Sequence, residues 1–171
     1  MSVVYPSPLV NASLMWSYNR PSYQRNTSLV TSISISTTNT VYSTGKGLSL
    51  TSLTGYIYLK ALLGSYQSGT ATYTIYLYRS TVGIPAAGSQ PNTGDVQLAS
   101  FSGSAVSSSP DSEIIDAIDT ISQGTLVYYY LAVSANAAVT VTIQARSSSA
   151  SPPNIGIRGA INTPSLEAIC V

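Results

Sequence analysis

Strict alternation of apolar and polar residues recurs along most of this chain, and it constrains the fold more than any other sequence feature. In residues 138–146, Val139, Val141 and Ile143 alternate with threonines and a glutamine. Successive side chains of a β-strand point to opposite faces, so a period of two predicts strands with one buried face. By this reasoning we expect strands over residues 29–36, 48–63, 71–79, 95–101, 126–134, 138–146 and 154–161.

Turn-forming segments rich in Gly, Pro and Asn separate these strands, for example residues 44–47 and 91–94. The strands 126–134 and 138–146 are close enough in sequence to form a hairpin through residues 135–137. Short strands separated by such turn-forming segments predict an all-β fold, either an antiparallel β-sandwich or a barrel.

One segment departs from the alternation. In residues 110–121 the apolar residues stand at positions 114, 115, 118 and 121, which is helical spacing. Asp111 or Ser112 would cap such a helix, and Glu113 would lie in its first turn. We therefore predict one short helix inserted in the β domain.

The first 28 residues keep no period, and 171 residues are most simply one domain. We predict an extended N-terminal arm over residues 1–28 and a single β-sandwich domain over residues 29–171. Pairing of the arm with a neighbouring subunit is the favoured role, and nucleic-acid contact through charge and stacking is a weaker alternative. The arm residues expected to make contacts are Trp16, Tyr18, Arg20, Tyr23 and Arg25.

The composition favours a protein that faces the exterior. Charged residues are only 8% of the chain, histidine is absent, and Ser and Thr together exceed a quarter of the residues. Few groups titrate or are screened, so such a surface changes little with pH or salt. The N-terminal segment shows neither a secretion signal nor a membrane span. Release within a virus particle explains exposure without a signal, and we expect a virion or otherwise extracellular location.

The chain has no catalytic or metal-binding pattern that we recognise. Without histidine, the Ser-His-Asp triad and histidine metal sites are excluded, and the single Cys170 cannot build a zinc or iron–sulfur site. We expect no enzyme activity, no cofactor and no metal. The acidic run Asp111, Glu113, Asp116 and Asp119 leaves a calcium site or a glycosidase pair as alternatives to the favoured interpretation, a solvated helix face.

Tyrosines occur as pairs two residues apart on three predicted strands, which places each pair on one face. Subunit contact is the leading interpretation of these pairs, with plain cross-strand packing and sugar binding as alternatives. Tyr129 is expected to be buried with its hydroxyl satisfied near the end of a sheet, while its neighbours face outward. The paired residues are Tyr56 and Tyr58, Tyr76 and Tyr78, and Tyr128 and Tyr130. Two further motifs, at Asn11 and Asn26, fit the glycosylation sequon but are short enough to occur by chance.

From about Leu50 to Arg146 the order of features resembles jelly-roll modules of bacterial surface proteins and phage fibres, which are carbohydrate-binding-like domains. The stretches that carry the resemblance are ATYTIYLYRSTVGIPAAG, VQLASFSGSAV and ISQGTLVYYYLAVSA. In composition the chain is also similar to single jelly-roll capsid or turret proteins of archaeal viruses from hot acidic springs. These resemblances imply a sandwich of the jelly-roll type and a structural role without catalysis.

Together these observations predict a viral structural protein, a capsid or capsid-associated subunit such as a turret or spike base. Its expected partners are copies of itself and other virion proteins. The alternatives are a carbohydrate-binding receptor-recognition module of a fibre or spike, with a glycan as partner, and an extracellular filament subunit.

Overall fold

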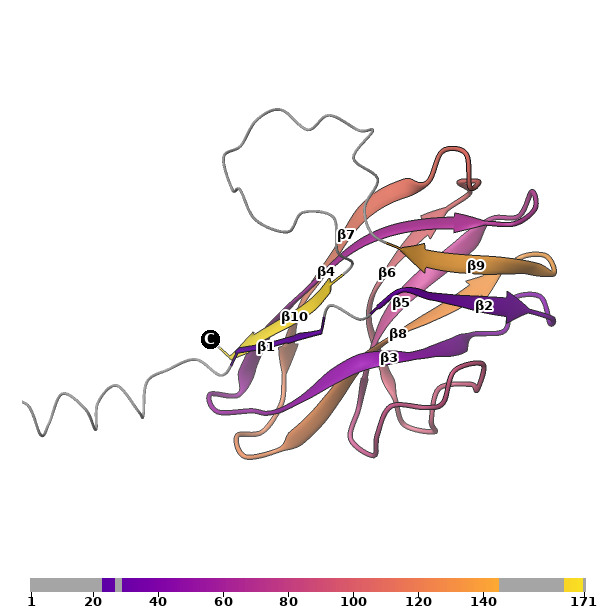
Figure 1. Cartoon of the computed structure of the whole chain (residues 1–171). Helices are drawn as coiled ribbons and strands as arrows, with labels where there is room; N and C mark the ends of the chain where they lie inside the picture. Colours follow the sequence, from indigo (N-terminus) through magenta and orange to yellow (C-terminus); the bar gives the residue numbers. More distant parts are fainter. Residues whose placement is uncertain (1–22, 27–28, 145–164, 171) are drawn as a thin grey trace, which may run out of the picture.

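The structure is a computed structural model that describes residues 23–26, 29–144 and 165–170, and all regular structure in this part of the chain is β-strand. Two antiparallel sheets form a sandwich, one with six strands and one with four (Figure 1). The prediction of an all-β antiparallel sandwich is confirmed. Within the described residues, no helix is long and apolar enough to cross a membrane.

The six-stranded sheet is organised around β4, its longest strand. On one edge β4 pairs with β7 along ten residues; on the other it pairs first with β10 and then with β9. The strand β1 lies beside β10, and β2 lies beside β9. Beside β4, the short strands β10 and β9 therefore lie end to end in one row of the sheet. The short strands β1 and β2 lie end to end in the next row. The strands are β1 (Tyr23–Asn26), β2 (Thr31–Ile35), β4 (Tyr56–Gln67), β7 (Asp111–Thr120), β9 (Val139–Gln144) and β10 (Ser165–Cys170).

The four-stranded sheet has the order β3-β8-β5-β6, and its strands are β3 (Tyr42–Thr51), β5 (Tyr73–Ser80), β6 (Val96–Gly103) and β8 (Leu126–Ala135). The predicted hairpin between β8 and β9 is wrong, because the two strands belong to different sheets. The chain crosses from one sheet to the other between Ala135 and Val139. Each strand pairs instead with strands distant in sequence, β8 with β3 and β5, and β9 with β2 and β4.

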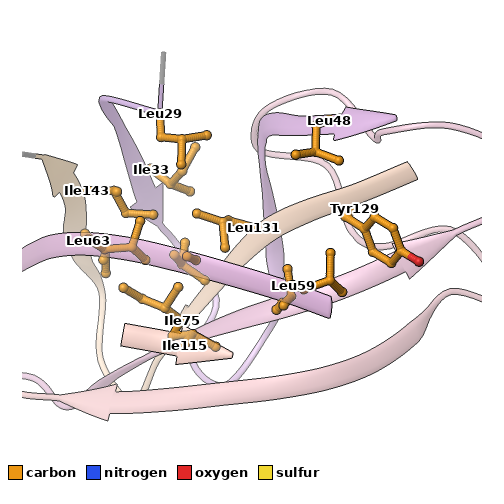
Figure 2. Packing of buried hydrophobic residues seen from close by; sticks show 14 of the residues in the cluster. Leu29, Ile33, Leu48, Leu59, Leu63, Ile75, Ile115, Tyr129, Leu131 and Ile143 are labelled. Atoms are coloured by element: carbon orange, nitrogen blue, oxygen red, sulfur yellow. The ribbon is translucent and has the colours of Figure 1, made fainter. Parts of the chain in front are cut away.

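The core lies between the sheets and follows the predicted alternation. On β5, Tyr73, Ile75 and Leu77 are fully buried, while the alternate residues face outward. On β9, Val141 and Ile143 are buried as expected. Figure 2 shows aliphatic side chains from both sheets meeting in this core, with Tyr129 at one end of the cluster and its hydroxyl directed away from the aliphatic groups. Burial of these side chains supplies the main stabilisation of the sandwich.

The predicted helix over 110–121 is wrong, because residues 111–120 form β7. Its inward face carries Asp111, Glu113, Ile115 and Asp119, and its outward face carries isoleucines. A strand whose buried face is acidic loses the usual alternation of apolar and polar residues. The remaining apolar positions then imitate a helical period.

Several predictions fall outside the described residues. These include the final strand expected over 154–161 and the arm residues up to position 22. Residues 23–26, expected at the end of the arm, form β1 and pair with β10 of the same chain. The row of β1 therefore belongs to the sandwich itself.

Candidate functional site

Carboxylates of β7 bind hydroxyl and guanidinium groups of the opposite sheet. At one end of the strand, Asp119 is 3% exposed. The Tyr129 hydroxyl donates to Asp119 Oδ2 at 2.8 Å, and Arg79 Nη1 donates to Oδ1 at 2.8 Å. Charge-assisted bonds of this kind are stronger than neutral ones. The expectation of a buried Tyr129 with a satisfied hydroxyl is confirmed.

A second polar cluster lies at the other end of β7. The buried Tyr73 hydroxyl donates to Asp111 Oδ2 at 3.0 Å and lies 2.8 Å from Ser65 Oγ. Ser65 in turn donates to the buried Glu113. A Cβ at Gly103 of β6 would lie 2.8 Å from the Tyr73 hydroxyl and close to the Asp111 carboxylate, so a side chain there would require this cluster to shift. The two clusters fix β7 against the four-stranded sheet at both ends.

The acidic run is divided between the two faces and the two ends of β7. Asp116 faces outward, while the other three acids face inward and bind protein groups at opposite ends of the strand. No group of three or more candidate metal ligands occurs in the part of the chain that the structure describes. The favoured interpretation of the run, a solvated helix face, is wrong, since these acids anchor buried hydroxyls.

A third tyrosine–carboxylate hydrogen bond lies on the outer face of the four-stranded sheet. Tyr130 points outward from β8 but is fully buried. The segment of residues 81–95 is hydrogen-bonded to this sheet, through Ser89 and Gly88 to Ser43 of β3 and through Asp95 to Tyr130. Its hydroxyl donates to Asp95 Oδ2 at 2.7 Å, and its ring stacks on Tyr78 with centroids 5.6 Å apart. Ser43 of β3 anchors the segment by donating its Oγ to the Pro85 carbonyl at 2.9 Å. Tyr130 is therefore not part of an exposed aromatic patch.

These buried tyrosines predict a loss of stability at alkaline pH. Burial is the main cause that raises the pKa of Tyr73, Tyr78 and Tyr130 above the ordinary value of about 10. The unfolded chain ionises these groups near pH 10 while the folded chain keeps them neutral. We expect the free energy of unfolding to be unaffected by these tyrosines below about pH 10 and to fall as pH rises further. Denaturant midpoints measured from pH 8 upward test this.

Tyrosinate absorbance is the control for the alkaline experiment. For these three residues it should appear together with the loss of far-ultraviolet circular dichroism. Native dichroism retained while all tyrosines titrate with an ordinary pKa would contradict the prediction. A Tyr73→Phe variant should show a shallower fall, because one of the titrating groups is gone.

The outer face of β4 and β7 is a surface of mixed apolar and charged residues that we call the β4–β7 stripe. Ile118 is 70% exposed, Tyr56 55% and Ile114 50%. Cross-strand partners place Tyr58 beside Ile118, Lys60 beside Asp116 and Leu62 beside Ile114. One pair of opposite charges is thus flanked by an apolar pair on each side. The stripe consists of Tyr56, Tyr58, Lys60 and Leu62 on β4 and Ile114, Asp116 and Ile118 on β7.

The structure separates the predicted tyrosine pairs. Tyr76, Tyr78, Tyr128 and Tyr130 lie on the outer side of the four-stranded sheet, whereas Tyr56 and Tyr58 lie on the outer side of the other sheet. They therefore do not form one patch. Tyr23 and Arg25 lie in β1, where their Cα partners are Ile169 and Glu167. Trp16, Tyr18, Arg20 and the Asn11 sequon lie outside the described residues, and Asn26 is the last residue of β1.

Ile114 and Ile118 belong to the exposed stripe, and sequence reasoning placed them among the apolar residues of a predicted helix. As a strand, the run DSEIIDAID places Ser112, Ile114, Asp116 and Ile118 on one face and its other residues on the opposite face. Acids therefore occur on both faces, and alternation alone does not mark the two isoleucines as exposed.

Comparison with known proteins gives a limited result. No family model and no curated protein matches the chain. Among solved structures, the chain is similar to the structure of Eiger TNF from S. frugiperda, at 11% sequence identity and a TM-score of 0.45. The match covers 90% of this chain and 94% of that chain.

Proposed function

We propose that this protein is a structural subunit of a virus particle, a capsid or capsid-associated protein that assembles with copies of itself. The observation that carries the proposal is the inverted strand β7, which buries its acids and exposes Ile114 and Ile118. Among the described strands, β7 pairs only with β4, so the exposed isoleucines lie at an edge of the sheet. Exposed apolar groups at a sheet edge favour contact with another protein surface.

The β4–β7 stripe is suited to a second copy of the same chain. Lys60 and Asp116 are neighbours at its centre, and apolar pairs lie on both sides of them. A two-fold axis through this centre would bring Lys60 of each copy against Asp116 of the other, and apolar groups against apolar groups. Self-complementary patches of this kind make isologous contacts. Repetition of such contacts around a particle adds their energies.

The proposal includes a fold of the jelly-roll type. Consecutive strands alternate between the sheets from β2 to β5, and β6, β7, β8 and β9 alternate again. This order supports the eight-row double-sheet arrangement found in viral capsid and lectin domains. The low charge content and the absence of histidine support a particle surface as the location. The proposal assigns no catalytic step, cofactor or metal.

The state of association tests the proposed function. We expect the full-length chain to form discrete oligomers or larger particles in light scattering, with a regular assembly in negative-stain electron micrographs. High ionic strength should not dissociate the assembly, because most of the stripe is apolar. A chain that stays monomeric at concentrations of about 100 μM, where contacts with dissociation constants below that value are formed, would overturn the proposal.

A further inference from the structure

A shallow polar pocket lies at one end of the four-stranded sheet, on the opposite sheet from the β4–β7 stripe. Its volume is about 330 Å³. It opens between the turn that connects β2 to β3 and the turn that connects β8 to β9, both at the same end of the sandwich (Figure 1). Its lining residues are Asn39, Thr72, Thr74, Tyr76, Ser134, Ala135 and Asn136.

Hydrogen bonds hold the pocket walls in place. The Asn39 amide N–H donates to the Ala135 carbonyl at 2.7 Å, which joins the two turns. The Thr72 N–H donates to Asn136 Oδ1 at 2.9 Å, and the Asn136 N–H donates to the Thr72 carbonyl at 3.0 Å. The Tyr76 hydroxyl lies 3.0 Å from Ser134 Oγ. A pocket whose walls are already ordered loses little conformational freedom when a ligand binds.

The pocket also offers polar groups that are still available. Among the described residues, the side-chain amide of Asn39, the Asn136 Nδ2 group and the Thr72 hydroxyl have no hydrogen-bond partner, and all three side chains are exposed. Amides and hydroxyls both donate and accept, which is the pattern that a sugar hydroxyl needs. The half-buried Tyr76 ring adds an amphipathic surface beside them.

The pocket lining has no charged side chain, which favours an uncharged ligand. This lining contains no lysine, arginine, histidine, aspartate or glutamate. Phosphates, sulfates and carboxylates would find no cation in the lining, and metal ions would find no carboxylate. A neutral polyol with an apolar ring face fits the donors, acceptors and aromatic surface together.

We propose that this pocket binds neutral pyranose units of a glycan. The residues that bind are Asn39, Thr72 and Asn136 through hydrogen bonds, with Tyr76 against the sugar ring. This site lies on the other sheet from the β4–β7 stripe, so binding does not depend on the proposed assembly. A variant with Ile118→Asp should keep the glycan signal even where it loses association, which separates the two proposals.

The test is a glycan array probed with the full-length chain, carrying neutral oligosaccharides beside sialylated and sulfated ones. We expect signal on neutral glycans, little changed between pH 5 and 8 or by added salt. An array blank at every neutral glycan overturns the proposal. Signal confined to anionic glycans and lost in salt overturns it as well, because that is the behaviour of a charged surface.

Two variants assign the signal to the pocket. Asn39→Gly removes the amide and suits the backbone, because Asn39 has a positive φ of 59°. Thr72→Val removes only a hydroxyl. Each should weaken binding of the best oligosaccharide about three- to tenfold, the value of one lost hydrogen bond. The matched control is Thr142→Val, which removes the same group from the other sheet and should bind normally. Unchanged binding by both folded pocket variants would overturn the assignment.

Discussion

Replacement of Asp119 by alanine is expected to lower the free energy of unfolding by about 3 kcal/mol, the scale for removing one partner of a buried ion pair. The change removes the carboxylate that accepts a hydrogen bond from the fully buried Tyr129 hydroxyl and that pairs with Arg79. For a chain of this length, the corresponding decrease in Tm is roughly 6–12 °C. Denaturant unfolding of monomeric protein at low concentration measures the effect, because association would otherwise add to apparent stability.

The matched control is Asp116→Ala on the same strand. Asp116 faces solvent, so its loss should change the free energy of unfolding by no more than about 0.5 kcal/mol. Tyr129→Phe keeps the buried ring and removes only the hydroxyl, and we expect about 1–2 kcal/mol from it. Equal effects from Asp119→Ala and Asp116→Ala would contradict the role assigned to the buried acid. A double variant with both Asp119 and Tyr129 changed should lose less than the sum of the two, since they share one bond.

Substitution of Ile118 by aspartate is expected to disrupt assembly. An isoleucine buried in a contact contributes about 1.5–3 kcal/mol, and a two-fold contact contains two copies of it. The dissociation constant should therefore rise by about 100- to 10,000-fold. Sedimentation velocity over a concentration series measures the shift from assembly to monomer. The isolated fold should remain intact, because Ile118 is 70% exposed in the single chain.

Val82→Asp is the matched control for Ile118→Asp, because Val82 is 72% exposed and lies in the segment over the opposite sheet. It should associate like the unmodified chain. The Lys60→Asp variant should weaken assembly, and adding Asp116→Lys to it should restore assembly by re-forming the opposite charges across the axis. Equal dissociation by the Ile118 and Val82 variants would show that general surface charge, not the stripe, controls association.

Alternation predicted most of the strands because each exposes one face of the sandwich. On β5 and β9 the buried residues are those that the period of two selects. The partners of the strands could not be predicted in the same way. β8 and β9 are adjacent in sequence, and each has an apolar face that can pack in the core. An apolar face is equally compatible with two strands in one sheet and with two strands in opposite sheets.

β7 shows why part of the candidate site was missed. Its inward acids accept hydrogen bonds from Tyr73, Ser65, Arg79 and Tyr129, which are far from it in sequence or lie in the opposite sheet. When those partners are unknown, an acidic residue is predicted to be exposed. The result was the prediction of a helix with a solvated acidic face, where the structure has a strand that exposes Ile114 and Ile118.

The tyrosine-rich stretch of β8 was predicted in part. The placement of Tyr129 in the core was correct, because its neighbours Val127 and Leu131 on the same face are strongly apolar. The burial of Tyr130 was missed, because it depends on the return of residues 81–95 over the sheet and on the bond to Asp95. Alternation determines the direction of a side chain but does not reveal a loop that covers it.

The pairing of β1 with β10 places the first and the last described strand side by side at one end of the sandwich. Tyr23 and Ile169 are register partners, so the chain enters and leaves the described sandwich at neighbouring points. Figure 1 shows these strands at one end and the turns around the polar pocket at the other. A fusion partner or surface attached through either β1 or β10 would hold the subunit by that end. The pocket would then face away from the point of attachment. Such a subunit is suited to one-sided display on a scaffold.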